Sequence, residues 1–172
     1  HLFADGAGKT MIRRRDAMLG LLISQAAGSW AAPAQTLDAS EQLLPTAVDL
    51  PQSLALAVRQ GQPLVVLATL HGCPFCKVAR ENYLLPASKD GAVVTQIHFL
   101  SRMPLRDWEG RATTHGQVVK DLGIEVAPTV LFYGRGGKEL VPRLTAGSTS
   151  DFYGAYLDER LAQARASFKS AS

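Results

Sequence analysis

Residues 64–76, LVVLATLHGCPFC, decide the fold of this chain. The run up to Leu70 is almost continuously apolar and partly β-branched, which is typical of a strand buried on both faces of a sheet. A His-Gly break follows, and then come two cysteines, Cys73 and Cys76. Pro74 suits the first turn of a helix, where its missing N–H would have no partner. The stretch therefore predicts a buried strand, a short turn and a helix that begins at the cysteines.

Apolar periodicity on either side of this stretch predicts further helices and strands. Residues 51–60 have the spacing of a helix. The helix after the cysteines is expected to run from 77 to about 85, and Pro86 and the Lys-Asp-Gly turn at 89–91 close it. Residues 92–100, rich in β-branched side chains, predict a second strand, and residues 103–111 are expected to be irregular.

The second half of the chain predicts a helix, a hairpin and a final helix. Its expected elements are a helix from Thr113 or Thr114 to Leu122 that Gly123 stops, strands over 129–133 and 139–144, and a helix from Ser148 or Ser150 to about Ala166. Pro142 places the second of these strands at a sheet edge. The order predicts an α/β fold, with a central mixed sheet of about four strands flanked by helices.

Composition limits the classes of protein to consider. The chain has 172 residues, 47% of them hydrophobic and 19% charged, which suits one domain with a modest extension and excludes wholesale disorder. The formal charge is +3, but a basic cluster at residues 9–15 contributes most of the excess. Because the rest of the chain is nearly neutral, we expect no nucleic-acid partner.

The N-terminal residues have the pattern of an export signal. Residues 1–10 show no pattern and are set aside as an extraneous or read-through segment. Residues 11–34 combine a basic start, a short apolar run and an Ala-x-Ala end, which is typical of a cleaved signal peptide; a cytosolic amphipathic helix is the alternative. The apolar run is too short for a permanent membrane span. We therefore expect a periplasmic protein, exported by the general secretory rather than the twin-arginine route, with 35–48 as a loose leader and 49–168 as the domain.

The spacing of the two cysteines suits thiol–disulfide exchange. At the start of a helix, Cys73 would lie at the positive end of the helix dipole and beside free backbone N–H groups, which favour the nucleophilic thiolate. Cys76 would lie one turn further on the same face. It could therefore attack a mixed disulfide formed on Cys73.

Other uses of the cysteine pair fit less well. A structural disulfide would close so short a loop that it would restrict the unfolded chain very little. A zinc site would need two further ligands, and His71, His98 and His115 are scattered along the sequence. Haem attachment fails because Lys77 follows Cys76. We expect neither a metal nor a cofactor beyond the redox-active cysteine pair.

A second motif lies at residues 125–129, EVAPT, at the mouth of the predicted hairpin. Pro128 cannot donate to a strand ladder and suits a cis peptide bond. The backbone near Ala127 would then be free to pair with an extended substrate. Pro74 and Phe75 would add apolar contacts beside the sulfur atoms. His71, when protonated, could stabilise the thiolate of Cys73, or it could be a solvated loop residue.

Taken together, these features resemble the thioredoxin family. The matching parts are the strand into CxxC, the Gly-Ile-x-x-x-Pro-Thr stretch at 123–129, the Gly-Gly-Lys-Glu turn and the terminal helix, over roughly residues 50–165. The chain looks similar to exported thioredoxin-like proteins associated with sulfur-oxidation clusters, which share Cys-Pro-aromatic-Cys, the loop at 107–110 and a Thr-Thr-His helix start. The resemblance implies that Cys73 attacks, Cys76 resolves and Pro128 is the cis-proline.

The chain also departs from that family. Thioredoxins usually have a buried Asp six residues before the first cysteine and a Trp immediately before it, where this chain has Leu67 and Gly72. The resemblance implies a thiol–disulfide oxidoreductase that acts on protein disulfides. We expect it to reduce them, with electrons from a membrane donor. A disulfide-donating oxidase or isomerase is the alternative, and a non-catalytic binding module is an alternative of another class.

Overall fold

A mixed β-sheet forms the centre of the fold, in the order β2-β1-β5-β6, with β7 also pairing with β5. The apolar run forms β1 (Leu64–Thr69), and all of its residues are buried. It pairs in parallel with β2 (Val93–His98) and antiparallel with β5 (Thr129–Gly134). The sequence-based prediction of an α/β fold with a central mixed sheet is confirmed.

The computed structural model describes residues 36–145 and 152–171. The expected signal peptide (11–34), the segment before it and the two candidate helix caps Ser148 and Ser150 lie outside the described residues. Within the described ranges, no helix is both long and apolar enough to cross a membrane.

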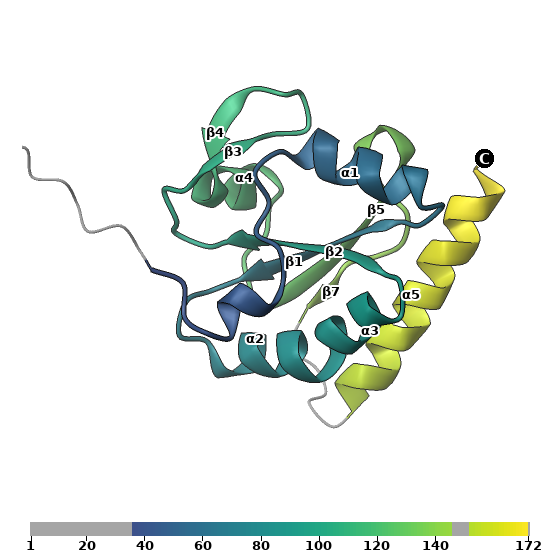
Figure 1. The fold of residues 1–172 in the computed structure, drawn as a ribbon, viewed down its shortest axis with the longest axis horizontal. Coiled ribbons are helices and arrows are strands. Elements are labelled where there is room, and N and C mark those ends of the chain that lie inside the picture. The colour runs from purple at the N-terminus through teal and green to yellow at the C-terminus, as the bar shows by residue number, and fades with distance from the viewer. Residues whose placement is uncertain (1–35, 146–151, 172) are drawn as a thin grey trace, which may run out of the picture. The chain divides into compact units, whose positions relative to one another are not determined.

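Helices cover both faces of the sheet, because successive residues of its buried strands point to opposite faces. Figure 1 shows α1 (Leu50–Arg59) and α4 (His115–Asp121) on one side, where Leu64, Val66 and Ala68 of β1 join their apolar side chains. On the other side, Val65 and Leu67 pack with the helices that follow the cysteines and with α5 (Tyr153–Ser170). The sheet thus carries two apolar clusters, one on each face.

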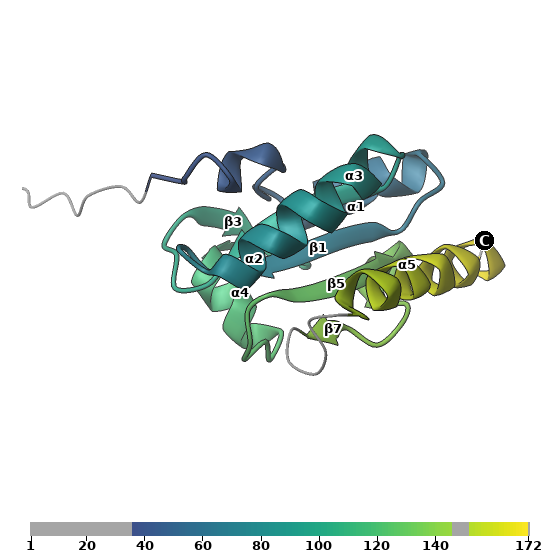
Figure 2. The same cartoon turned by 90° about the horizontal axis from the view of Figure 1, so that it is seen from below.

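The helix after the cysteines is longer than the sequence suggests. It consists of α2 (Pro74–Val78), a π-helical turn η2 (Ala79–Leu84) and α3 (Leu85–Lys89), which Figure 2 shows as one continuous rod. The prediction that Pro86 closes it is wrong. In the π-helical turn the N–H of Leu85 bonds to the carbonyl of Arg80, and Pro86 then occupies the first turn of α3, where a missing N–H is tolerated.

Two further predictions need correction. Residues 103–111 are not wholly irregular, because β3 (Pro104–Arg106) pairs antiparallel with β4 (Ala112–Thr114). The strand expected over 139–144 is instead two short pieces, β6 (Lys138–Glu139) and β7 (Leu144–Thr145), which follow the 3₁₀ turn η3 (Arg135–Gly137). Pro142 lies between the pieces, where a residue without an N–H interrupts the ladder.

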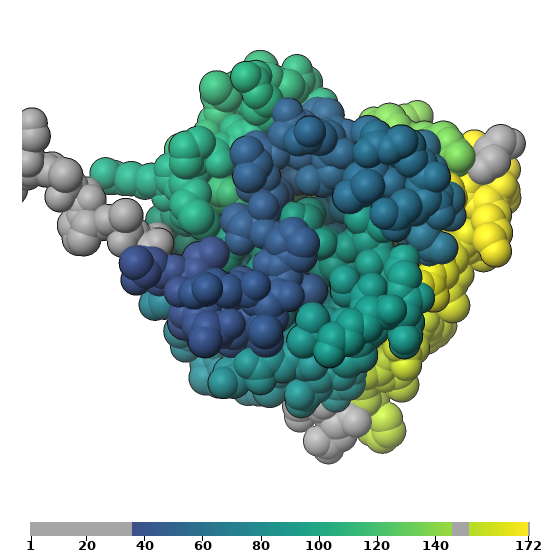
Figure 3. All heavy atoms as spheres, viewed as in Figure 1, coloured from purple at the N-terminus to yellow at the C-terminus, as the bar shows by residue number. Residues whose placement is uncertain are grey.

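The segment before α1 is packed against the domain rather than loose. It contains the 3₁₀ turn η1 (Glu41–Leu43), and Leu44 and Ala47 are buried. Thr46 forms a parallel bridge with Gln96 at the edge of β2. Figure 3 shows its dark-blue atoms lying against neighbouring elements. Residues 40–47 therefore belong to the folded unit, although the sequence suggested a leader there.

Candidate functional site

The two cysteines lie where β1 turns into α2. The N–H of Cys73 donates to the carbonyl of Leu70 at 3.2 Å, which closes a tight turn. Gly72 has a φ of 71° in this turn, a conformation that glycine adopts without steric cost. Cys73 is the N-cap of α2, and Pro74 occupies the first turn, as the sequence predicts. The dithiol is therefore held between a buried strand and a helix N-terminus.

The two sulfur atoms lie in different surroundings. Cys73 is partly exposed and Cys76 is buried, and both are free cysteines. The backbone N–H of Cys76 donates to Sγ of Cys73 at 3.2 Å. One sulfur is thus open to a partner while the other is shielded behind it.

Burial and, to a lesser extent, a hydrogen bond with the Cys73 side chain together raise the pKa of the Cys76 thiol to about 12. Interactions with Leu70 and Thr69 oppose the rise without cancelling it. In the neutral pH range Cys76 is consequently a protonated thiol. It can act as a nucleophile only when it gives up its proton during the reaction.

The second motif reaches the same end of the sheet. Ala68 of β1 is paired with Thr129 of β5, so Pro128 lies beside the point where β1 leaves the sheet toward the cysteines. The Ala127–Pro128 peptide bond is cis. Pro128 is buried and Ala127 is half-buried. The register therefore brings Ala127 and Pro128 to the end of the sheet that carries the two cysteines.

Apolar side chains are exposed on both of these segments. Phe75 lies between the cysteines in sequence and is 64% exposed, and Val126 precedes Ala127 and is 46% exposed. Exposed apolar groups beside a reactive sulfur can contact a polypeptide partner. Phe75 is thus available for the contact that the sequence suggests.

A pocket of about 250 Å³ opens beside Cys73. Its lining combines the start of α2 with the segment before α1 and consists of Asp38, Glu41, Leu70, Gly72, Cys73, Pro74, Lys77 and Arg80. The sequence identified the cysteines and Pro74 as site residues. It did not identify Asp38, Glu41 or Arg80.

Arg80 is a buried charge whose partners are neutral. Charged side chains on a helix usually face solvent, but Arg80 is only 2% exposed. Its Nε donates to Oε1 of Gln96 at 2.6 Å, and its terminal nitrogens donate to Oγ of Ser40 at 2.8 Å and Oγ1 of Thr69 at 2.7 Å. Arg80 therefore ties the segment before α1 to β1 and β2.

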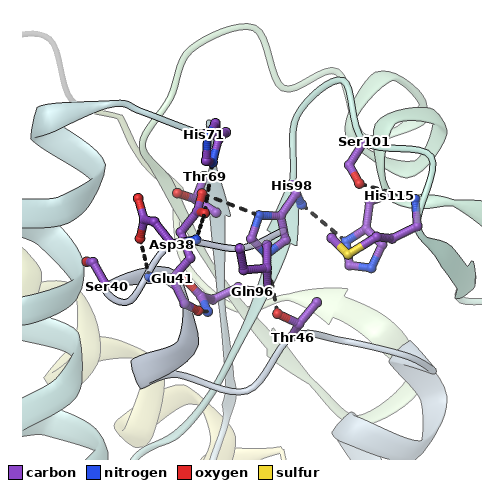
Figure 4. A network of polar contacts seen from close by, with 12 residues as sticks. Asp38, Ser40, Glu41, Thr46, Thr69, His71, Gln96, His98, Ser101 and His115 are labelled. Carbon is purple, nitrogen blue, oxygen red and sulfur yellow. Dashed lines mark hydrogen bonds and ion pairs between the residues drawn. The ribbon is translucent and has the colours of Figure 1, made fainter. Parts of the chain in front are cut away.

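Glu41 and His71 form a pair next to the dithiol turn. Nδ1 of His71 lies 3.0 Å from Oε2 of Glu41, and the histidine side chain is 64% exposed whereas that of Glu41 is 2% exposed. The hydrogen bond and the charge of Glu41 raise the pKa of His71. Figure 4 shows His71 and His98 approaching Glu41 from two sides. His98, which lies on β2, is buried.

One sequence signal could have identified this segment. Asp38 and Glu41 bond reciprocally, since each backbone N–H donates to the other's carboxyl group, at 2.9 and 2.8 Å. This is the arrangement of a capping box, whose signature is Ser, Thr, Asp or Asn followed three positions later by Glu or Gln before an apolar run.

Thioredoxins usually have a buried Asp six residues before the first cysteine. In this chain that position is Leu67, which is fully buried and carries no titratable group.

Comparisons with known proteins place the chain in a family. The model of the thioredoxin-like domain family matches residues 50–160. A search of curated proteins found no match. Thioredoxin O2 from Arabidopsis thaliana, in the oxidized state, is 18% identical with a TM-score of 0.42, and the match covers 69% of this chain and 93% of that chain. Mitochondrial thioredoxin 3 from Saccharomyces cerevisiae is 15% identical with a TM-score of 0.45, over 72% and 97%.

A third solved structure, a DsbH oxidoreductase, is 13% identical with a TM-score of 0.47, over 73% of this chain and 85% of that chain. At such identities the assignment rests on the family match, which spans most of the described domain. The cysteine pair lies inside the matched residues, at the start of a helix that follows a central strand. The chain therefore belongs to the thioredoxin-like domain family and is a thiol–disulfide oxidoreductase.

Proposed function

We propose that this protein reduces disulfide bonds of protein partners in the cell envelope, with Cys73 as the attacking and Cys76 as the resolving cysteine. The observation that carries the proposal is the asymmetry of the pair. Cys73 is partly exposed and accepts an N–H at a helix N-terminus, whereas Cys76 is buried with a pKa raised to about 12. A partner's disulfide can reach the first sulfur and not the second.

The reaction then proceeds in two exchange steps. The thiolate of Cys73 attacks one sulfur of the partner's disulfide, forms a mixed disulfide and releases the other sulfur as a thiolate that takes a proton from water. Cys76 then loses its proton and attacks Sγ of Cys73, which breaks the mixed disulfide and releases the second partner thiolate. Two electrons pass to the partner, and the protein is left with a Cys73–Cys76 disulfide.

Partner binding is assigned to residues around Cys73. Pro74 and Phe75 are exposed and offer apolar contact on one side, and the backbone at Ala127 and Pro128 lies at the same end of the sheet on the other. Pro128 has no N–H to engage in a ladder, so an extended partner segment can pair with the adjoining backbone. The arrangement suits a polypeptide better than a small thiol.

Location and direction belong to the proposal as well. Residues 11–34 have the pattern of a cleaved signal peptide, which supports export to the periplasm. A reductant in that compartment must be reduced again after each turnover, so we propose a membrane-bound dithiol donor as its electron source. The resemblance to exported thioredoxin-like proteins of sulfur-oxidation clusters supports the reducing direction.

The roles of the cysteines are tested by single substitutions. Cys73→Ser should abolish reduction of a disulfide-bonded protein substrate. Cys76→Ser should also stop turnover but accumulate a mixed disulfide with the substrate, visible by mass spectrometry and on non-reducing gels. The double variant is the matched control and should trap nothing. Equal loss without trapping by Cys76→Ser would refute the assignment of attacking and resolving cysteines.

The direction is tested by the reduction potential of the dithiol. A potential near roughly −270 mV, as in thioredoxin, fits a reductant, whereas one near roughly −120 mV, as in DsbA, fits an oxidant. Equilibration with glutathione buffers of known ratio, read by alkylation and mass spectrometry, provides the measurement. A value at the oxidising end would exclude the reducing role while leaving the exchange mechanism intact.

A further inference from the structure

The carboxyl group of Glu41 is the centre of a polar cluster that the exchange chemistry does not require. Its Oε2 accepts hydrogen bonds from the backbone N–H of Asp38 at 2.9 Å and from Nδ1 of His71 at 3.0 Å. Its Oε1 is buried and has no hydrogen-bond partner within residues 36–145 and 152–171. A buried acceptor without a hydrogen bond destabilises the fold, because it has lost its hydration. Oε1 is therefore an acceptor that a cation or a donor would stabilise.

His98 lies on the far side of Glu41 from His71. Its Nδ1 is 4.0 Å from Oε1, and both side chains are almost fully buried. Its Nε2 is 3.3 Å from Oγ1 of Thr46. In one tautomer the Nε2–H donates to Thr46 and the lone pair of Nδ1 faces Oε1; in the other, Thr46 donates to Nε2 and the Nδ1–H points toward Oε1 across 4.0 Å (Figure 4). At that distance neither tautomer gives Oε1 a hydrogen bond.

Asp38 completes the cluster on the solvent side. One ligand atom each from Asp38, Glu41 and His71 lie within 4.8 Å of one another. Asp38 and His71 are exposed, so their side chains can adjust, and Asp38 and Glu41 also line the pocket beside Cys73. An ion therefore has a route to the buried carboxyl group.

The reciprocal hydrogen bonds of Asp38 and Glu41 explain only part of this arrangement. They account for the proximity of the two carboxyl groups, and they use Oε2 of Glu41 and Oδ1 of Asp38. They leave Oε1 without a partner. They also do not explain why two imidazoles, one from the turn after β1 and one from β2, approach the same carboxyl group.

The charges around the cluster suit one cation, because Asp38 and Glu41 are both acidic. Arg80 repels a cation, but its donors are directed to Gln96, Ser40 and Thr69.

We propose that Asp38, Glu41 and His71 form a binding site for a divalent zinc ion. One imidazole nitrogen and two carboxyl oxygens, with a water molecule as the fourth ligand, are a set that Zn²⁺ accepts, with tetrahedral geometry and metal–ligand distances of about 2.0–2.2 Å. The ion would neutralise the carboxyl groups and link the segment before α1 to the turn that precedes Cys73. The site uses no sulfur and goes beyond the redox function, so either can fail without the other.

The test uses the Cys73→Ser/Cys76→Ser variant of the chain, because the dithiol itself can bind zinc. Titration calorimetry with Zn²⁺ at pH 7.5, together with metal analysis after dialysis, should show one zinc ion per chain. His71→Ala and Glu41→Gln, each added to this variant, should weaken zinc binding by more than about 100-fold. Loss of a metal ligand should exceed the ~10–100-fold loss of affinity that follows removal of a residue that only hydrogen-bonds to a ligand. Glu109→Gln, an exposed carboxylate elsewhere, is the matched control and should change nothing.

A second measurement needs no substitution in the cluster, which protects the test if Glu41→Gln fails to fold. Histidine ring ¹⁵N NMR of the double-serine variant should show a zinc-dependent ligation shift at Nδ1 of His71. His115, whose ring lies 5.6 Å from that of His98, is an internal control and should show no ligation shift. Absence of binding at ~100 µM zinc, or binding that survives His71→Ala, would overturn the proposal. Binding without a shift at His71 would equally overturn it.

Discussion

Cys76 shows how burial sets the chemistry of a single side chain. Its pKa is raised to about 12, chiefly by burial, so almost none of it is ionised at neutral pH. In a Cys73→Ser variant, we expect iodoacetamide to modify Cys76 more than about 100-fold more slowly at pH 8 than it modifies a cysteine in an unstructured peptide. The rate should still be rising at pH 10. Mass spectrometry of quenched samples provides the measurement, and a plateau below pH 9 would contradict the prediction.

Arg80 is buried, although a charged residue on a helix is normally expected at the protein surface. It is 2% exposed and bonds to Ser40, Thr69 and Gln96. Arg80→Met should lower the free energy of unfolding by about 3 kcal/mol, because several buried polar groups lose their partner at once. Urea unfolding measures this loss. Lys89→Met, an exposed basic residue on the same continuous helix, is the control and should stay within about 0.5 kcal/mol.

Residues whose role depends on local sequence could be predicted, and those whose role depends on distant partners could not. The cysteine pair and Pro74 follow from a strand that runs into a helix, and the structure has that arrangement. Glu41 is brought to His71 across 30 positions and to His98 by the sheet. A periodic pattern of residues within a short stretch of sequence cannot reveal a contact between residues so far apart. Its capping-box partner Asp38 was the one local sign.

At the scale of the elements, α4 depends on a cap that the sequence identifies. Oγ1 of Thr114 accepts a hydrogen bond from the N–H of Gln117 at 3.3 Å. Thr114→Ala should lower the free energy of unfolding by about 1 kcal/mol, because one N–H of the first turn loses its acceptor. Thr114→Ser keeps the hydroxyl group and should retain most of that stability. Chemical denaturation measures the free energy of unfolding of both variants. Equal losses of stability in the two would show that the hydroxyl group contributes nothing.

The elements that were predicted wrongly depend on features that a short sequence pattern does not show. The helix continues past Pro86 because a π-helical turn removes the need for its N–H. The pairing of β3 with β4 involves only three residue pairs, too few for a clear alternation of polar and apolar residues. Strong, long patterns such as β1 and α1 were located to within a residue or two. Short elements, which depend on their neighbours, were not.

For the whole molecule, two buried histidines predict loss of stability in mild acid. Burial, and then the charge of His98, lower the pKa of His115 to about 4, and burial also lowers the pKa of His98. Below pH 6.5 the unfolded chain therefore binds protons that the folded chain does not, and the free energy of unfolding falls as the pH drops toward 4. The contribution of His115 is about 3 kcal/mol.

Urea unfolding between pH 7 and pH 4 tests this effect, with the cysteines kept in one redox state. His115→Asn keeps an acceptor for the backbone N–H of His98 but cannot be protonated, so it should flatten the pH dependence. An unchanged slope in that variant would assign the acid sensitivity to other groups. The mixed sheet and its flanking helices were predictable from the sequence, but the strand order and this buried histidine pair were not.

The packed segment ahead of α1 has a practical consequence for anyone who trims the protein to its recognisable part. A fragment cut to the family match, residues 50–160, would discard Glu41, Leu44 and Ala47 at one end and Ala164 and Phe168 at the other. Arg80 would lose Ser40, and Gln96 would lose both carbonyl acceptors of its side-chain amide. Such a fragment would expose the edge of β2 and aggregate, whereas one that begins at residue 36 keeps the fold whole.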